Sequence, residues 1–285
     1  KSFSYCFNNK FRIMIRIHDL KRFLFGITPP FLMSIVVKIY RILMGKDHNR
    51  IYKEQDRPDA IDLNNLYFRV GAFVTNIAHD KLRYSGGVSF NYTQHHFMQY
   101  YRFGPKALKE FYEEHQPKTI FEQHFLSTKS VRKQKYLPWI DPGNLTDRLE
   151  HGLDSSHGHQ ARGPVSNKKL MLELQRLGNC SKSIQKKGYL IDEGFPRGYF
   201  LSRSNGKWVF HVVGGKHRVA ALIHLGWKVI PFCLEPNWPV VIFEEEIEEW
   251  PGVKKGDYVK DEAQQVFDSY FRDPNRELWK RNPKT

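Results

Sequence analysis

Cysteine is scarce in this sequence. Its 285 residues include three cysteines, Cys6, Cys180 and Cys233, which are far apart and odd in number. This pattern supports neither a disulfide framework nor a thiolate metal site, and it fits a reducing, cytoplasmic setting. The sequence also shows no internal repeat and no low-complexity segment.

A long, uncharged apolar run is missing as well. The most apolar stretch, residues 23–45, is broken by Pro29 and Pro30 and carries Lys38 and Arg41, so it is too short and too charged to predict a transmembrane helix. Residues 1–60 are expected to form a basic, apolar N-terminal segment. Two interpretations stay open for it: an amphipathic helix lying peripherally on the anionic inner face of a membrane, or a helix packed on the protein body.

Acidic residues are outnumbered by basic ones. The chain has 45 Lys and Arg against 30 Asp and Glu, which gives a formal net charge of +15. The surface field should therefore attract nucleic acid, acidic lipid head groups or phosphorylated small molecules, and charge alone does not choose among them. A hydrophobic content of 40% is enough for a globular core.

Residues 61–150 are expected to be mainly helical. Leu108, Phe111 and Tyr112 recur at helical spacing in GPKALKEFYEEHQPK before Pro117 stops the helix. Four histidines of this region lack the spacing of metal ligands and are interpreted as surface or core residues: His95, His96, His115 and His124.

Residues 151–245 indicate an α+β module. The module begins with a loop, DSSHGHQARGPVSN, whose histidines we interpret as part of a flexible polar loop near a ligand rather than a metal cluster: His157 and His159 beside Asp154, with His151 just before. Ser166 then caps a helix over residues 168–177, and a second short helix is expected over 181–187.

Three strands and a helix follow in the same module. RGYFLSRS and KWVFHVV predict two strands joined by a tight turn at Asn205-Gly206, and WKVIPFCLE predicts a further strand. Between them, VVGGKHRVAALIHLG reads as strand, turn and helix, ended by Gly226. The tail, residues 246–285, is expected to be helical with an ordinary packing face formed by Ala263, Val266, Phe267 and Tyr270.

The turn at Gly214 and Gly215 carries the strongest sign of chemistry. Glycines between a strand and a helix let the backbone approach a ligand closely, and the free N–H groups of the helix start then favour an anion such as phosphate. Lys216, His217 and Arg218 occupy the first helical turn, where cations oppose the helix dipole. An anion bound there would relieve this mismatch. The alternative is a strain-free turn with solvated basic side chains.

Neither the Walker pattern nor GxGxxG is present. The segment Gly214-Gly215-Lys216-His217-Arg218, followed by Val219-Ala220-Ala221, instead resembles the GG-C-H-R signature of sulfiredoxin and the G-x-x-R-x-x-A box of ParB-type proteins. These families share a small α/β fold that binds ATP or CTP, and some relatives are kinases that act on small molecules such as serine. The resemblance covers about residues 160–240.

The resemblance also implies a phosphate-facing helix before the turn. Where sulfiredoxins carry a basic residue, a hydroxyl residue and a threonine, this chain has Arg176, Asn179 and Ser183, whose spacing places them on one helical face. One departure is decisive: Lys216 stands in the position of the sulfiredoxin cysteine. Sulfinic acid reduction needs that thiolate, so sulfiredoxin activity is excluded while the nucleotide site is retained.

The expected function is therefore a nucleotide-dependent phosphotransferase or nucleotide hydrolase that uses ATP or CTP, with Mg²⁺ as the accompanying ion. The tail and the basic N-terminus resemble proteins encoded among surface-polysaccharide biosynthesis enzymes, which implies a small molecule or a polysaccharide precursor as acceptor. Asp192, Glu193 and His217 are the candidates for acid–base catalysis. Two alternatives stay open: a ParB-like nucleic-acid-binding protein with a nucleotide switch, and a non-catalytic, membrane-associated scaffold.

Overall fold

The computed structural model describes residues 51–67, 73–127, 136–141, 152–234 and 239–278. From Ile51 onward the chain forms one compact unit. The expectation of a membrane-surface helix concerns residues that lie outside the described part. Within the described part, no helix combines the length and the apolar character needed to cross a bilayer.

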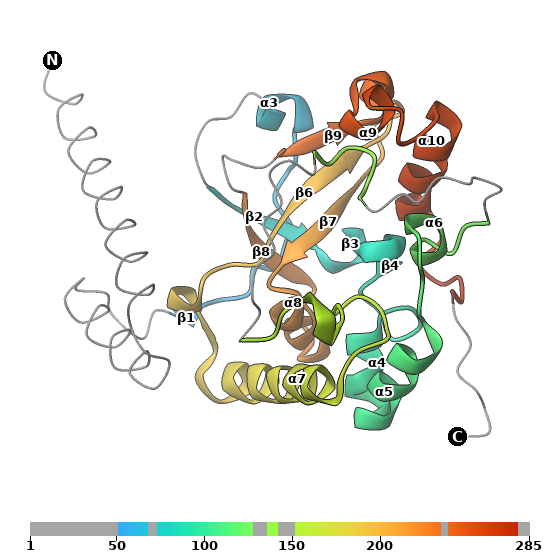
Figure 1. Cartoon of the computed structure of the whole chain (residues 1–285). Helices are drawn as coiled ribbons and strands as arrows, with labels where there is room; N and C mark the ends of the chain where they lie inside the picture. The colour runs from blue at the N-terminus through green and yellow to red at the C-terminus, as the bar shows by residue number, and fades with distance from the viewer. Residues whose placement is uncertain (1–50, 68–72, 128–135, 142–151, 235–238, 279–285) are drawn as a thin grey trace, which may run out of the picture. The chain divides into compact units, whose positions relative to one another are not determined.

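A seven-stranded mixed sheet forms the centre of this unit (Figure 1). Six strands follow the order β2-β8-β6-β7-β3-β4, and β9 pairs in parallel with the end of β6. The β3–β7 pairing is parallel, whereas β6–β7 and β2–β8 are antiparallel. The strands are β2 (Phe73–Ala78), β3 (Leu82–Tyr84), β4 (Val88–Ser89), β6 (Arg197–Ser202), β7 (Trp208–Gly214), β8 (Val229–Leu234) and β9 (Val241–Phe243).

Helices cover both faces of the sheet, and side chains along β6 alternate between the two cores. Phe200 belongs to the larger core, while Tyr199 and Leu201 belong to the smaller one. The larger core is packed by α4 (His96–Phe103), α5 (Pro105–Glu114), α7 (Asn167–Lys187) and α8 (Lys216–His224). The smaller core involves α6 (Ile120–Gln123), α9 (Pro251–Lys254) and α10 (Lys260–Asp268). Short remaining elements are α3 (Leu63–Tyr67) and the pair β1 (Ile51–Tyr52) and β5 (Tyr189–Leu190).

Most elements expected in residues 151–285 are present, and the predicted α+β class is confirmed at this level. The strands β6 and β7 are joined by a turn in which Gly206 has a φ of 79°. The N–H of Lys169 donates to the Ser166 hydroxyl, which confirms the predicted helix cap. The tail helix α10 buries Ala263, Val266 and Phe267, as predicted.

Two features of the fold differ from the sequence-based expectation. The two helices expected over 168–177 and 181–187 form one continuous helix, α7. Residues such as Gly178 and Ser181 lower helix propensity, but burial of one face against α5 and α8 outweighs that cost. In addition, residues 61–150 contribute β2, β3 and β4 to the sheet. β3 and β4, with three and two residues, are too short to show periodicity, and the β2 sequence FVTNIA lacks an alternation of apolar and polar residues.

The four histidines of residues 61–150 are part of the packed interior, as expected. His95, His96 and His124 are buried, and His115 stacks on Phe125 with 4.8 Å between ring centroids. His96 likewise stacks on Phe111 at 4.1 Å. Their rings therefore serve as core aromatics that retain polar atoms.

Candidate functional site

The Gly-Gly turn joins β7 to α8 and has the backbone geometry that only glycine adopts easily. Gly215 is the N-cap of α8, with φ 73° and ψ 22° in the left-handed region. A Cβ atom there would lie 2.8 Å from the Cα atom of Pro196. The local sequence therefore allows the turn to pass close to the β5–β6 loop, and it leaves the first N–H groups of α8 without intrahelical acceptors.

A pocket of about 490 Å³ lies between this turn and α7. Its wall combines the turn and the first residues of α8 with one face of α7 and one residue of the preceding loop. The lining consists of Gln160, Leu172, Gln175, Arg176, Asn179, Cys180, Val213, Gly214, Gly215, Lys216, His217 and Arg218. Two segments that are about forty residues apart in sequence thus share one concave surface.

Seven of the eight residues predicted to bind nucleotide line this pocket: Gly214, Gly215, Lys216, His217, Arg218, Arg176 and Asn179. The eighth, Ser183, is exposed and lies one turn further along α7, outside the lining. Tertiary packing therefore brings together the turn and the helix face that the sequence placed in separate elements.

Asp192 and Glu193 are not part of the pocket lining. They lie in a short 3-10 turn, Ile191–Glu193, just after β5. The Arg218 guanidinium donates to the backbone oxygens of Glu193 and Gly194, the first at 2.6 Å, and the Glu193 charge raises the pKa of the pocket thiol of Cys180. This loop holds Arg218 at the rim, and the catalytic role of the two carboxylates stays a prediction.

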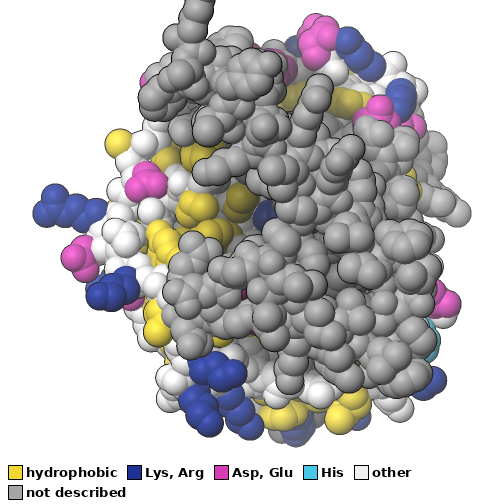
Figure 2. All heavy atoms as spheres, turned by 90° about the vertical axis from the view of Figure 1, so that its left-hand side faces the viewer, with side chains coloured by type: hydrophobic (Ala, Val, Ile, Leu, Met, Phe, Trp, Pro, Cys, Tyr) yellow, Lys and Arg dark blue, Asp and Glu magenta, His cyan; other side chains and the backbone are white. Residues whose placement is uncertain are grey.

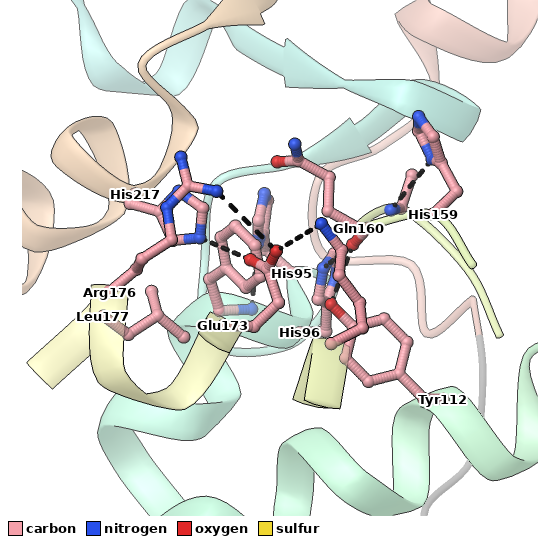
Figure 3. A network of polar contacts seen from close by, with 12 residues as sticks. His95, His96, Tyr112, His159, Gln160, Glu173, Arg176, Leu177 and His217 are labelled. Atoms are coloured by element: carbon pink, nitrogen blue, oxygen red, sulfur yellow. Dashed lines mark hydrogen bonds and ion pairs between the residues drawn. The ribbon is translucent and has the colours of Figure 1, made fainter. Parts of the chain in front are cut away.

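A buried carboxylate that the sequence analysis missed lies beside the pocket. Glu173, on α7, is fully buried, and its Oε2 atom lies 2.5 Å from Nε2 of His217. The other oxygen, Oε1, lies 2.9 Å from the Lys169 ammonium and 3.9 Å from the Arg176 guanidinium (Figure 3). Lys169 is also buried, with 2% of its side chain exposed. The spacing of Lys169, Glu173 and Arg176 on one helical face was the available sequence signal.

The protonation of this cluster follows from its contacts. Burial alone would raise the pKa of Glu173, but hydrogen bonds and charges from His217 and Lys169 outweigh burial and lower that pKa to about 2. Glu173 is therefore ionised at neutral pH and accepts the Nε2–H of His217. The His217 ring is further fixed by stacking on Phe97 at 4.7 Å. The contact with Glu173 thus uses Nε2 of the ring.

The remaining polar groups of the site do not form an evident metal centre. Among the described residues, no group of three or more His, Cys, Asp and Glu side chains could hold a metal ion. The ring of His157 bonds the Ser166 hydroxyl at 2.8 Å, and Nδ1 of His159 accepts from the Ala161 N–H; His151 lies outside the described residues.

Cys180 is the thiol of the pocket, and its charge state is also set by burial. Burial raises the pKa of Cys180 to about 11, although Arg218 and Arg176 act in the opposite direction. The thiol is therefore protonated at neutral pH, which makes it a weak nucleophile.

No protein-family model and no curated protein matches this chain. The likeness of the GGKHR segment to the ParB and sulfiredoxin families thus remains an expectation from the sequence. The site must be interpreted from its own geometry and charge.

Proposed function

We propose that the pocket between α7 and α8 binds a nucleoside triphosphate, ATP or CTP, and that the protein transfers or hydrolyses its terminal phosphate. The observation that supports this is the convergence of three cationic side chains, Arg176, Lys216 and Arg218, on a pocket whose wall includes a helix N-terminus. Cations and unsatisfied N–H groups at one place favour phosphate. A volume of about 490 Å³ also lies in the range of small-molecule sites.

In this proposal the turn and the cationic side chains position the transferred phosphate and stabilise its charge. Phosphoryl transfer requires positioning and stabilisation of charge on the transferred group. The N–H groups at Lys216, His217 and Arg218 would hold the terminal phosphate, and the side chains of Arg176 and Arg218 would neutralise it from two sides. The fold of the module would be the small ParB/sulfiredoxin-like type that the GGKHR segment resembles.

We assign the acid–base role to His217 rather than to Asp192 or Glu193. Glu173 fixes the ring through Nε2, and its negative charge would stabilise the imidazolium that forms when Nδ1 takes the proton of an acceptor hydroxyl or of water. Lys169 balances the charge of Glu173 and keeps the carboxylate ionised. The acceptor would be a small molecule or a polysaccharide precursor, as the sequence resemblance implies.

Thermal-shift measurements with ATP, CTP, ADP and GTP, each with and without Mg²⁺, test the proposal. At a ligand concentration of 100 Kd, binding to the folded state adds about 2.7 kcal/mol to the free energy of unfolding. We expect ATP or CTP to raise the melting temperature, and Arg218→Ala to lose most of this shift. Arg102→Ala, at an exposed position on α4, is the matched control and should respond like wild type.

The outcome also separates the alternatives. If no nucleotide raises the melting temperature, or if Arg218→Ala responds like wild type, nucleotide binding at this pocket is wrong. Binding of random-sequence DNA that weakens steeply with salt would then favour the nucleic-acid-binding alternative. Binding of the full chain to anionic vesicles without any nucleotide response would favour the scaffold.

A further inference from the structure

A second group of polar residues lies at the end of a neighbouring strand and shares Lys216 with the pocket. β3 runs parallel to β7, with Leu82 opposite Phe210 and Arg83 opposite His211. Both strands end in a glycine-containing turn, Ser85–Gly87 after β3 and Gly215 after β7. In sheets with parallel strands, ligands bind beside the carboxyl ends of the strands. The β3 end is therefore the place to look for a second ligand.

Two cationic side chains from different elements reach this strand end. The Lys216 ammonium, which also lines the pocket, lies 5.2 Å from the centre of the Tyr84 ring. Arg162 donates to Oε1 of Gln123 at 2.6 Å, and the amide of Gln123 in turn bonds the Ser85 hydroxyl. Lys216 and Arg162 are both half-buried. A guanidinium group and an ammonium group at the same end of a strand favour an anionic ligand.

His95 supplies a buried donor at the same place. Nδ1 of His95 accepts the backbone N–H of Phe97 at 3.1 Å as the cap of α4. Burial, together with Coulombic repulsion from His217 and Lys216, lowers the pKa of His95 to about 3, so the ring is neutral. A neutral ring with Nδ1 as acceptor carries its proton on Nε2. Within the described part of the chain, this buried Nε2 has no hydrogen-bond partner.

His95 lies near both the end of β3 and a residue of the pocket lining. Its ring lies 5.0 Å from the Tyr84 ring and stacks on His96 at 4.9 Å. His96 donates to the backbone oxygen of Gln160, whose residue lines the pocket (Figure 3). A buried N–H without an acceptor costs about 1–3 kcal/mol, so an oxygen atom supplied from outside the chain would remove that cost.

We propose that Tyr84, His95, Arg162 and Lys216 form a subsite, the β3-end subsite, for an oxyanion carried by the phosphoryl acceptor. The oxyanion is a phosphate or a carboxylate. It would enter beside Lys216 and Arg162 and meet the Nε2–H of His95 at the inner end. That the ligand is a phosphoryl acceptor rests on the proposed function. Binding of an anion at this subsite does not depend on nucleotide binding.

Calorimetric titration with inorganic phosphate tests the subsite. The protein is first saturated with Mg²⁺ and the β,γ-imido analogue of the nucleotide that binds, so that the turn at Gly215 is occupied. We expect phosphate still to bind wild type. Arg162→Gln and His95→Asn should each weaken phosphate binding about tenfold. Asparagine keeps the helix-capping acceptor and removes the ring donor. Acetate, titrated in the same way, shows whether a carboxylate is preferred.

Controls separate the subsite from the nucleotide pocket and from folding. Arg102→Gln should bind phosphate like wild type, and Arg162→Lys should retain most of the affinity because it keeps the charge. Both subsite variants should bind the nucleotide analogue within about twofold of wild type. If the variants do not fold, wild type that binds no phosphate beside the nucleotide analogue still overturns the subsite, and Arg162→Lys then tests the position by its retained affinity.

Three results bear on the two proposals separately. Phosphate that binds wild type only by displacing the nucleotide analogue overturns the subsite and leaves the proposed function standing. Unchanged phosphate affinity in both variants also overturns it. If no nucleotide binds but phosphate binds and depends on Arg162 and His95, the proposed function fails and the subsite stands.

Discussion

Replacement of Glu173 by glutamine is the sharpest test of the buried cluster. Glu173→Gln keeps the shape of the side chain and removes the negative charge that lies between Lys169, His217 and Arg176. The buried Lys169 ammonium would then have lost its carboxylate partner. We expect a large loss of stability and, because the amide no longer supplies the negative charge that faces the His217 ring, a loss of catalytic rate that exceeds any change in nucleotide affinity.

Two independent arguments give the size of the stability loss. Removing one partner of a buried ion pair costs about 3–5 kcal/mol. A pKa lowered from 4.5 to about 2 corresponds to about 3 kcal/mol of stability at neutral pH. For a chain of this size, about 3 kcal/mol lowers the melting temperature by about 6–12 °C.

The pH dependence follows from the direction of the shift. Glu173 has a lower pKa in the folded state than in the unfolded state, so its contribution is complete above pH 4.5 and is lost as the pH falls towards 2. Urea unfolding of wild type and Glu173→Gln, followed by tryptophan fluorescence at pH 7, 4.5 and 3.5, measures this. The difference between the two proteins should shrink over the two acidic points.

A matched control exists on α5. Glu113 pairs with Lys109 at the same helical spacing, 3.6 Å apart, but both side chains are 61% exposed. Glu113→Gln should therefore change the free energy of unfolding by less than about 0.5 kcal/mol. The double variant Lys169→Met with Glu173→Met should recover part of the loss, because no unpaired charge stays buried. A cost below about 1 kcal/mol for Glu173→Gln at pH 7 would refute the reasoning.

Two further predictions concern the turn and the core. Gly215→Ala should lower nucleotide affinity at least tenfold, because φ is 73° and the new Cβ atom would lie 2.8 Å from Pro196. Gly206→Ala is the control, because Gly206 has a similar φ of 79° but open space around it. It should lower the free energy of unfolding by about 1–2 kcal/mol and keep the nucleotide-dependent thermal shift. Equal thermal shifts in both variants would contradict this. Burial and Lys216 lower the pKa of His211 to about 3, so the stability from its neutral ring is lost as pH falls from 6.5 towards 3. His211→Phe should reduce the slope of unfolding free energy against pH between 6.5 and 4 in urea titrations, and parallel profiles would exclude the effect.

The sequence alone predicted the local backbone structure of the site. Paired glycines between an apolar strand and an alanine-rich helix predicted the turn, and a spacing of three residues placed Arg176 and Asn179 on one face of α7. These features depend on backbone conformation and helical period, which nearby residues decide. Ser183 lies on the same helical face and was therefore predicted as a binding residue, but it lies outside the pocket. A shared helical face does not define where a cavity ends.

Only the tertiary structure decided which charges meet. Glu173 and His217 are 44 residues apart, and nothing local to either residue indicates the contact at 2.5 Å between them. The parallel pairing of β3 with β7, which brings Tyr84 near Lys216, likewise joins segments that periodicity cannot connect. Sequence patterns determine which side chains share one face of a helix or strand. Burial and strand pairing determine which helices and strands pack against that face, and this packing brings the candidate catalytic residues together.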